Sequence, residues 1–116
     1  MILENKITLI TGASRGIGQA IALKLGQQGA IVIGTATTEN GANAISQYLE
    51  KANIKGIGIV LNVNDTDQIN DTMKIIKEKF GEIDILVNNA GITRDNLLVR
   101  MKDEEWDEII ETNLKS

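Results

Sequence analysis

A glycine-rich turn reads Thr11-Gly12-Ala13-Ser14-Arg15-Gly16-Ile17-Gly18. It follows an apolar run at residues 7–10 and precedes a segment whose apolar residues recur at helical spacing. Between a strand and a helix, glycines allow a tight turn, close approach of a diphosphate to the backbone, and close packing of the helix on the strand. The helix then directs its free N–H groups and the positive end of its dipole at the anion. The turn therefore predicts a dinucleotide-binding loop, although its G-x-x-x-G-x-G spacing is one step away from the G-x-G-x-x-G form.

Strand and helix patterns alternate along the chain. Runs rich in Ile, Val and Leu predict strands at residues 6–11, 30–35, 56–61 and 83–87, of which the first two are expected to be buried. Apolar residues at helical spacing predict helices at residues 16–28, 39–52 and 65–80, then a loop at 92–101 and a last helix from about residue 102. The alternation predicts an α/β fold of the Rossmann type, with a doubly wound parallel sheet in the order 3-2-1-4, right-handed crossovers and helices on both faces. All of residues 1–116 are expected to belong to one domain.

Each of the first three helices has an expected buried face. In chain order, these faces are Ile17, Ala20, Ile21 and Leu25; Ala42, Ile45, Leu49 and Ala52; and Ile69, Met73, Ile76 and Phe80. Gly29 is placed to end the first helix, and Gln68 stands where the capping-box partner of an N-cap at Asp65 belongs. Asn40-Gly41 could instead form the turn of a hairpin, which leaves an alternative to the second helix.

The composition excludes several classes of function. The chain carries a net charge of −4 and no basic stripe, which disfavours binding to nucleic acid. It contains no cysteine and no histidine, so a zinc site, a thiol nucleophile and a Ser-His-Asp triad are excluded, and no metal site is expected. No apolar run approaches the ~20 residues of a membrane span. The lack of cysteine is compatible with a reducing cytoplasm, where we expect the protein to be located.

Three motifs together resemble those of the short-chain dehydrogenase/reductase family. They are the loop at residues 11–18, Asn88-Asn89-Ala90-Gly91 and Asn113, which stands within Asn113-Leu114-Lys115-Ser116. The resemblance covers the whole chain and implies an oxidoreductase that uses a nicotinamide cofactor and forms homodimers or homotetramers. Residues 32–37, 91–98 and 101–106 look like the bacterial members of this family that act in fatty acid synthesis. The substrate that this likeness implies is a 3-oxoacyl thioester carried on acyl carrier protein.

The glycine turn is predicted to bind the cofactor through Gly12, Ala13, Ser14, Arg15, Gly16, Ile17 and Gly18. Thr11 is expected to brace the turn. A site that prefers NAD carries an acid about 20 residues after the glycines. Here the second strand ends Thr35-Ala36-Thr37, and Glu39 is the first acid. Arg15 can pair with the 2′-phosphate of NADP, and Thr37 could hydrogen-bond to the same group. We therefore expect NADPH to be preferred over NADH.

The resemblance adds cofactor-binding residues at the ends of two other strands. It implies that Asn62 and Val63 face the adenine, with Asn62 in place of the aspartate that is often found there. It also implies that Asn89, Ala90 and Gly91 lie near the cofactor ribose, whereas the preceding asparagine, Asn88, is expected to tie strands together.

Asn113 is the one catalytic residue that the resemblance implies for this chain. In the family it interrupts a helix and holds a water molecule, because its amide both donates and accepts. The serine and the Tyr-x-x-x-Lys of the family lie beyond this asparagine. Tyr48 and Lys51 are three residues apart rather than four, and we interpret them as surface residues of the second helix.

The chain is therefore expected to be the N-terminal, cofactor-binding part of a reductase, without activity by itself. The fourth strand would then have a bare edge, which invites aggregation. Two other functions remain open. One is a family member that acts on a different ketone or alcohol, and the other is a non-catalytic nucleotide-binding or assembly module.

Overall fold

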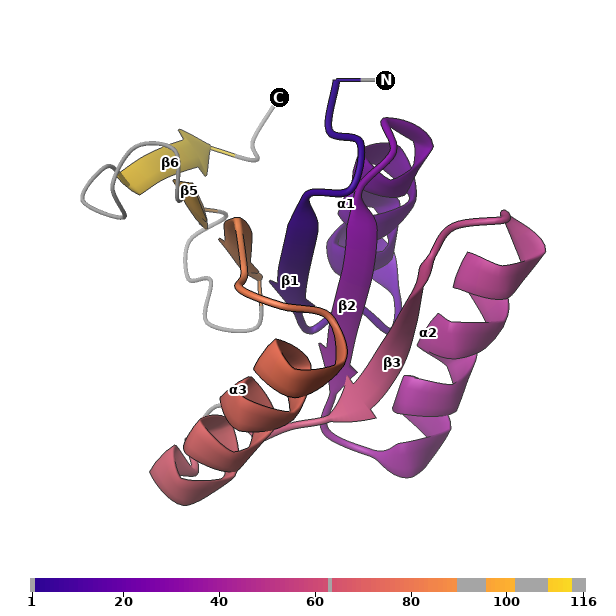
Figure 1. Cartoon of the computed structure of the whole chain (residues 1–116). Helices are drawn as coiled ribbons and strands as arrows, with labels where there is room; N and C mark the ends of the chain where they lie inside the picture. The colour runs from indigo at the N-terminus through magenta and orange to yellow at the C-terminus, as the bar shows by residue number, and fades with distance from the viewer. Residues whose placement is uncertain (1, 63, 90–95, 102–108, 114–116) are drawn as a thin grey trace.

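The computed structural model describes residues 2–62, 64–89, 96–101 and 109–113. Within them the elements follow in the order β1 (Ile7–Thr11), α1 (Gly16–Gln27), β2 (Ile31–Ala36), α2 (Glu39–Lys51), β3 (Gly56–Val60), α3 (Thr66–Lys79), β4 (Ile85–Asn88), β5 (Asn96–Met101) and β6 (Ile109–Asn113), as Figure 1 shows. The alternation expected as far as β4 is confirmed, with ends that differ by one or two residues. None of the described helices combines the length and the apolar character needed to cross a membrane.

The strands form one sheet in the order β3-β2-β1-β4-β5-β6. β1 runs parallel to both of its neighbours, so that Thr8 pairs with Val32 of β2 on one side and with Ile85 of β4 on the other. β3 is parallel to β2 as well. The predicted order 3-2-1-4 is therefore confirmed. Because these four strands run the same way, their carboxyl ends meet at one edge of the sheet, where folds of this type bind ligands.

The segment after β4 differs from the prediction. The loop expected at residues 92–101 and the helix expected from residue 102 are wrong where the structure describes them, because β5 and β6 are strands and form an antiparallel pair. β5 pairs antiparallel with β4, so the expected bare edge of the fourth strand is wrong too. An unpaired strand edge carries free N–H and C=O groups, and a neighbouring strand satisfies them. Strand pairing also suits the residue types of Leu97-Leu98-Val99 and Ile109-Ile110. A short helix without a packing partner has only marginal stability.

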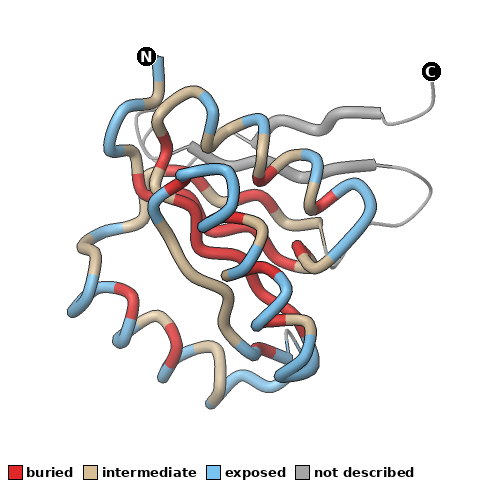
Figure 2. Tube along the Cα trace, turned by 90° about the vertical axis from the view of Figure 1, so that its right-hand side faces the viewer, coloured by how far each residue is buried: buried red, intermediate tan, exposed pale blue. Residues whose placement is uncertain are grey.

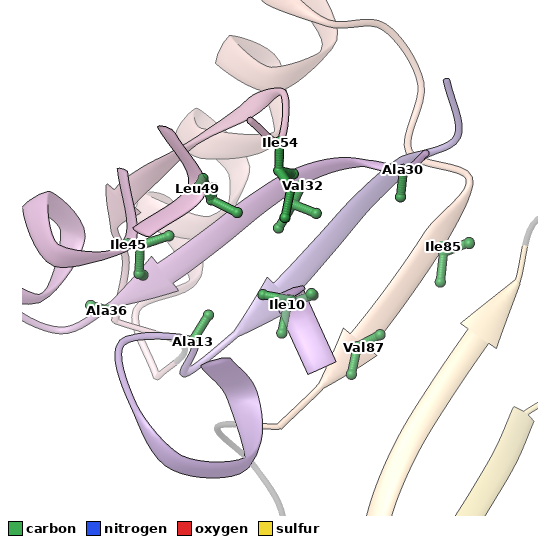
Figure 3. Close-up of a cluster of buried hydrophobic side chains, with 11 residues drawn as sticks. Ile10, Ala13, Ala30, Val32, Ala36, Ile45, Leu49, Ile54, Ile85 and Val87 are labelled. Atoms are coloured by element: carbon green, nitrogen blue, oxygen red, sulfur yellow. The ribbon is translucent and has the colours of Figure 1, made fainter. Parts of the chain in front are cut away.

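The core lies on both faces of the sheet. α1 and α2 cover one face, where Ile10 of β1 packs with Ile45 of α2 and Val87 of β4 (Figure 3). α3 covers the opposite face, where Leu9 of β1 and Ile76 of α3 belong to a second cluster. Adjacent residues of a strand point to opposite faces, which explains why Leu9 and Ile10 enter different clusters. Figure 2 shows the buried residues concentrated along the strands.

The buried face predicted for α1 is confirmed only in part. Ile17 is 44% exposed and Ala20 is exposed, whereas Gly18 and Ala22 are buried. At Gly18 the physical reason is that α1 approaches the glycine turn so closely that a Cβ would lie 2.1 Å from the Gly12 carbonyl oxygen. The two other residues of the predicted face are partly buried against the core, and they are Ile21 and Leu25.

The faces of α2 and α3 agree better with the sequence pattern. On α2 the buried residues are Ala42, Ile45 and Leu49, as predicted, while Ala52 lies after the helix and is exposed. On α3 the predicted stripe faces the sheet, with Ile76 buried, Met73 and Phe80 packed against the second cluster, and Ile69 partly exposed.

The helix ends follow the expected signals with one exception. Gly29, at φ +97°, ends α1, and the side chain of Thr38 caps α2, so the hairpin alternative at Asn40-Gly41 is excluded. Asp65 caps α3 by accepting from the Gln68 N–H at 3.1 Å. A capping box would require the Gln68 side chain to accept from the Asp65 N–H, and this bond is not formed. The Gln68 side chain accepts instead from the N–H of Asn62, because the Asp65 N–H already donates to the Asn62 carbonyl at 3.0 Å.

Candidate functional site

The glycine turn is fastened to β2 on one side. The Gly12 N–H donates to the Thr35 hydroxyl at 3.2 Å, and the Ala13 N–H donates to the Thr35 carbonyl at 2.8 Å. Gly12 has φ +64°, a conformation that residues with a Cβ rarely adopt. Both N–H groups are thus used inside the protein. Gly12 and Ala13 therefore shape the turn and have no free N–H to offer a ligand.

Thr35 was missed by the sequence reasoning. It is 1% exposed, and its hydroxyl is the acceptor on which the turn rests. A signal was present, because a threonine within an otherwise apolar buried strand needs a hydrogen-bond partner.

β4 fastens the turn from the other side. The Thr11 hydroxyl donates to Asn88 Oδ1 at 3.1 Å and accepts from the Asn89 N–H at 3.0 Å. Asn89 Nδ2 donates in turn to the Gly12 carbonyl at 2.9 Å. These bonds agree with the expectation that Thr11 braces the turn and that Asn88 ties β1 to β4.

Tyr48 does not lie on the surface as interpreted from the sequence. It is partly buried, and its hydroxyl donates to the carbonyl of Ala13 at 2.7 Å. Burial raises the pKa of Tyr48 to about 12, so the phenol remains a protonated donor at neutral pH. Lys51 is exposed, as expected. The interpretation failed for Tyr48 because its partner is a backbone carbonyl 35 residues away, which no local pattern records.

The start of α1 offers free donors at the carboxyl edge of the sheet. The first bond into the helix runs from the Gln19 N–H to the Arg15 carbonyl at 3.4 Å. The N–H groups of Gly16, Ile17 and Gly18 have no acceptor among the described residues. Gly16 has φ +60°, and the space where its Cβ would stand is open to 4 Å. Unpaired amides at a helix start, beside open space, form an arrangement that fits the phosphates of a dinucleotide.

Asn89 carries an unsatisfied atom beside this helix start. Its Oδ1 is buried and has no hydrogen-bond partner among the described residues. A buried acceptor without a partner is costly, so the position fits a donor that a ligand brings. A ribose hydroxyl is such a donor, and the prediction for Asn89 names the ribose.

The side chains at the end of β2 are free of negative charge. Arg15 and Thr37 are exposed, and Thr35-Ala36-Thr37 contains no acid. Gly41, in the first turn of α2, lies so near Ser14 that a Cβ on it would stand 3.4 Å from the Ser14 Cβ. The start of α2 therefore lies beside the glycine turn. Arg15, whose guanidinium has no ion pair among the described residues, is a cation available there to an anionic group.

The remaining predicted site residues are Asn62, Val63, Ala90, Gly91 and Asn113. Asn62 is exposed, and its Oδ1 accepts from the Asn64 N–H at 2.9 Å, which leaves the NH₂ group as the donor for a base edge. Val63, Ala90 and Gly91 lie outside the described residues. Asn113 is on β6, paired with a residue of β5, so its expected place on a helix is wrong. Its catalytic role stays a prediction.

Replacing Thr35 by valine is expected to destabilise the fold by about 1–3 kcal/mol, because the Gly12 N–H loses its acceptor while the shape of the side chain is kept. Thr8→Val is a matched control. Thr8 is also buried in the sheet, but its hydroxyl donates to the Lys6 carbonyl, which still accepts from the Ile31 N–H at 2.9 Å. Urea unfolding of both variants measures the difference. Equal losses would mean that the turn does not depend on Thr35.

Comparison with known proteins agrees with this geometry. A family described as short chain dehydrogenase matches residues 6–116. The chain is 64% identical over 116 residues to the 3-oxoacyl-[acyl-carrier-protein] reductase FabG of Escherichia coli (strain K12), covering 100% of this chain and 46% of that protein. Proteins of the same name from Vibrio harveyi and Pseudomonas aeruginosa are 63% identical over 114 residues and 54% identical over 116 residues, with 98% and 100% of this chain and 46% and 47% of theirs covered. The chain thus spans about half the length of the curated relatives it matches.

Proposed function

This chain belongs to the short-chain dehydrogenase family, and from that premise we propose that it supplies the NADPH-binding part of a 3-oxoacyl-[acyl-carrier-protein] reductase. The support for the substrate is the identity of 54–64% to relatives that carry this name. The reaction converts a 3-oxoacyl thioester on acyl carrier protein to the 3-hydroxyacyl thioester, as a step of fatty acid synthesis in the cytoplasm. The working enzyme is a homodimer or homotetramer.

One observation carries the choice of cofactor. An exposed arginine stands directly before the free amides of α1, and no carboxylate follows at the end of β2. A carboxylate there would bind the ribose hydroxyls of NADH and repel the 2′-phosphate of NADPH. Arg15, with Thr37, attracts that phosphate instead. We therefore propose NADPH over NADH.

Each part of the site has a separate task in this proposal. Bound NADPH supplies the hydride for the 3-keto carbon. The amides of Gly16 and Ile17 hold the diphosphate, and Asn89 orients the adjacent ribose through its free Oδ1. Asn62 offers its NH₂ group to the adenine.

Asn113 remains the proposed catalytic member of the chain, as the residue that holds a water for proton relay. The 116 residues contain one tyrosine, and it donates to the glycine turn. We therefore propose that these residues bind cofactor and do not by themselves reduce the substrate.

A titration of the chain with NADPH and NADH, followed by nucleotide fluorescence, tests the proposal. Binding of NADPH is expected to be about ten- to a hundredfold tighter than binding of NADH, since a charge-assisted hydrogen bond contributes roughly 1.5–3 kcal/mol. Addition of a 3-oxoacyl thioester is expected to leave the NADPH unoxidised. Equal affinities for the two nucleotides would contradict the cofactor assignment, and no binding of either would contradict the proposed function as a whole.

A further inference from the structure

Two successive peptide groups of the glycine turn are bonded differently. The group between Gly12 and Ala13 is held at both ends, by the Asn89 side chain at 2.9 Å and by a β2 carbonyl at 2.8 Å. The next group, between Ala13 and Ser14, is held at its carbonyl end by the Tyr48 hydroxyl at 2.7 Å. The Ser14 N–H, at the other end of that group, has no acceptor among the described residues. It is therefore a donor left free by the protein.

The hydrogen bond from Tyr48 to the Ala13 carbonyl sets the direction of the Ser14 N–H. A trans peptide group directs its C=O and N–H in opposite directions, and no peptide bond among the described residues is cis. Because Tyr48 holds the Ala13 carbonyl on the side of α2, the Ser14 N–H faces away from Tyr48. Ala13 is 0% exposed, Ser14 is partly exposed and Arg15 is exposed, so the chain reaches the surface across this peptide group. The Ser14 N–H is thus on the side of the peptide group opposite Tyr48, two residues before the free amides of α1.

We propose that Tyr48 is a positioning residue for the cofactor, which fixes the Ala13–Ser14 peptide group so that the Ser14 N–H donates to a phosphate oxygen of NADPH. This inference rests on the proposed function, since it requires the turn to bind a dinucleotide. Tyr48 touches neither cofactor nor substrate. It acts through one hydrogen bond that joins α2 to the turn, and its ring packs against the core that covers the same face of the sheet.

The variant Tyr48→Phe tests the proposal, because it removes the hydroxyl and keeps the packed ring. Ser46→Ala is the matched control. Ser46 lies on the same helix, and its hydroxyl accepts from the Gly58 N–H of β3 at 2.8 Å, so this variant also removes one bond between a side chain and the backbone. Both variants are expected to lower the melting temperature by a similar amount, roughly 4 °C. Tyr48→Phe is expected to raise the Kd for NADPH about tenfold, while Ser46→Ala leaves it within about twofold.

A spectroscopic readout separates positioning from a loss of stability. In amide NMR spectra of the full chain, the Ser14 N–H is expected to shift on addition of NADPH, and to shift much less in Tyr48→Phe. Tyr48 is the one tyrosine among the 116 residues, so 3-fluorotyrosine labels this position alone. Its fluorine resonance in otherwise unaltered protein is expected to move when NADPH binds, and this measurement does not depend on the variant folding.

Each pattern of results decides between the claims. Weaker NADPH binding in Tyr48→Phe, with Ser46→Ala unchanged and a fluorine shift on binding, supports the inference. Tight NADPH binding by Tyr48→Phe, an equal loss of NADPH affinity in both variants, or a fluorine resonance that stays in place overturns the inference and leaves the proposed function standing. Failure of the unaltered chain to bind NADPH overturns both.

Discussion

Gly18→Ala is expected to lower the stability of the fold by about 2–3 kcal/mol and to weaken NADPH binding about a hundredfold. An added Cβ at this position would lie 2.1 Å from the Gly12 carbonyl oxygen and 2.7 Å from Asn89 Nδ2. These two atoms are themselves hydrogen-bonded at 2.9 Å. The methyl group would therefore clash with both partners of the hydrogen bond that fastens the turn to β4. Because the nearest of these atoms belongs to the backbone, it has little room to move away.

The expected loss of stability is a balance of two terms. Alanine is favoured over glycine inside a helix by about 1 kcal/mol, so the variant gains helix propensity. Overpacking against a fixed backbone costs more than this gain, because α1 has to shift away from the turn or the Asn89 bond has to break. The loss of affinity follows from the same displacement. The amides of Gly16 and Ile17 move with the start of α1. A hundredfold loss is about 2.7 kcal/mol, which corresponds to partial weakening of two donors that each contribute roughly 1.5–3 kcal/mol to binding a charged phosphate.

Gly26→Ala is the matched control on the same helix. A Cβ on Gly26 would meet the side chain of Ile54 at 2.5–2.8 Å, so this variant is also crowded, but by side-chain atoms far from the turn. Thermal melts and NADPH titrations of both variants are expected to agree in the direction of the stability change. They are expected to differ in affinity, with Gly26→Ala binding NADPH within about twofold of the unaltered chain. A Gly18→Ala protein that melted and bound normally would mean that the close approach of α1 to the turn is unnecessary.

The parallel half of the fold could be predicted because each strand carries its own signal. Ile7, Leu9 and Ile10 make β1 nearly all apolar, and such a run belongs to a strand covered on both faces. The face of α1 could not be found in this way, since hydrophobic periodicity gives weight to large residues such as Ile17. The contact is made by Gly18, where the absence of a side chain is the important property. β5 pairs with the strand directly before it in the chain, and it was missed because a short apolar run fits a helix, a loop or a strand.

The candidate site also has a part that the sequence predicts and a part that it does not. The glycine spacing located the turn, since the need for φ > 0 at Gly12 and Gly16 is a property of the residues themselves. The residues that hydrogen-bond to the turn cannot be identified from the sequence around it. Thr35 and Tyr48 act on backbone groups at positions 12 and 13, at sequence separations of 23 and 35 residues. A single sequence shows that such polar residues need partners, but only the packed structure shows which backbone group each one takes.

Arg15→Ala is expected to raise the Kd for NADPH about ten- to a hundredfold and to leave the Kd for NADH within about twofold. Arg15 precedes α1 in an extended conformation, and its side chain makes no capping bond to the helix. It is exposed, and no ion pair or hydrogen bond of its guanidinium joins it to another described residue. Removing the side chain should therefore leave the melting temperature unchanged, so that a change in affinity reports on the nucleotide alone.

The comparison of two nucleotides makes this prediction specific. NADPH and NADH differ by the 2′-phosphate, so an effect confined to NADPH assigns Arg15 to that group, whereas equal weakening of both would place it on the shared diphosphate. Lys24→Ala is the control for net charge, because Lys24 is an exposed cation in the last turn of the same helix, and it should change neither affinity. Arg15→Lys keeps the charge but loses the planar fork that pairs with two phosphate oxygens, so its affinity for NADPH should fall between those of the unaltered chain and Arg15→Ala. Unchanged NADPH binding in Arg15→Ala would identify Arg15 as a solvated surface residue, and any preference for NADPH would then depend on Thr37 and the lack of an acid at the end of β2.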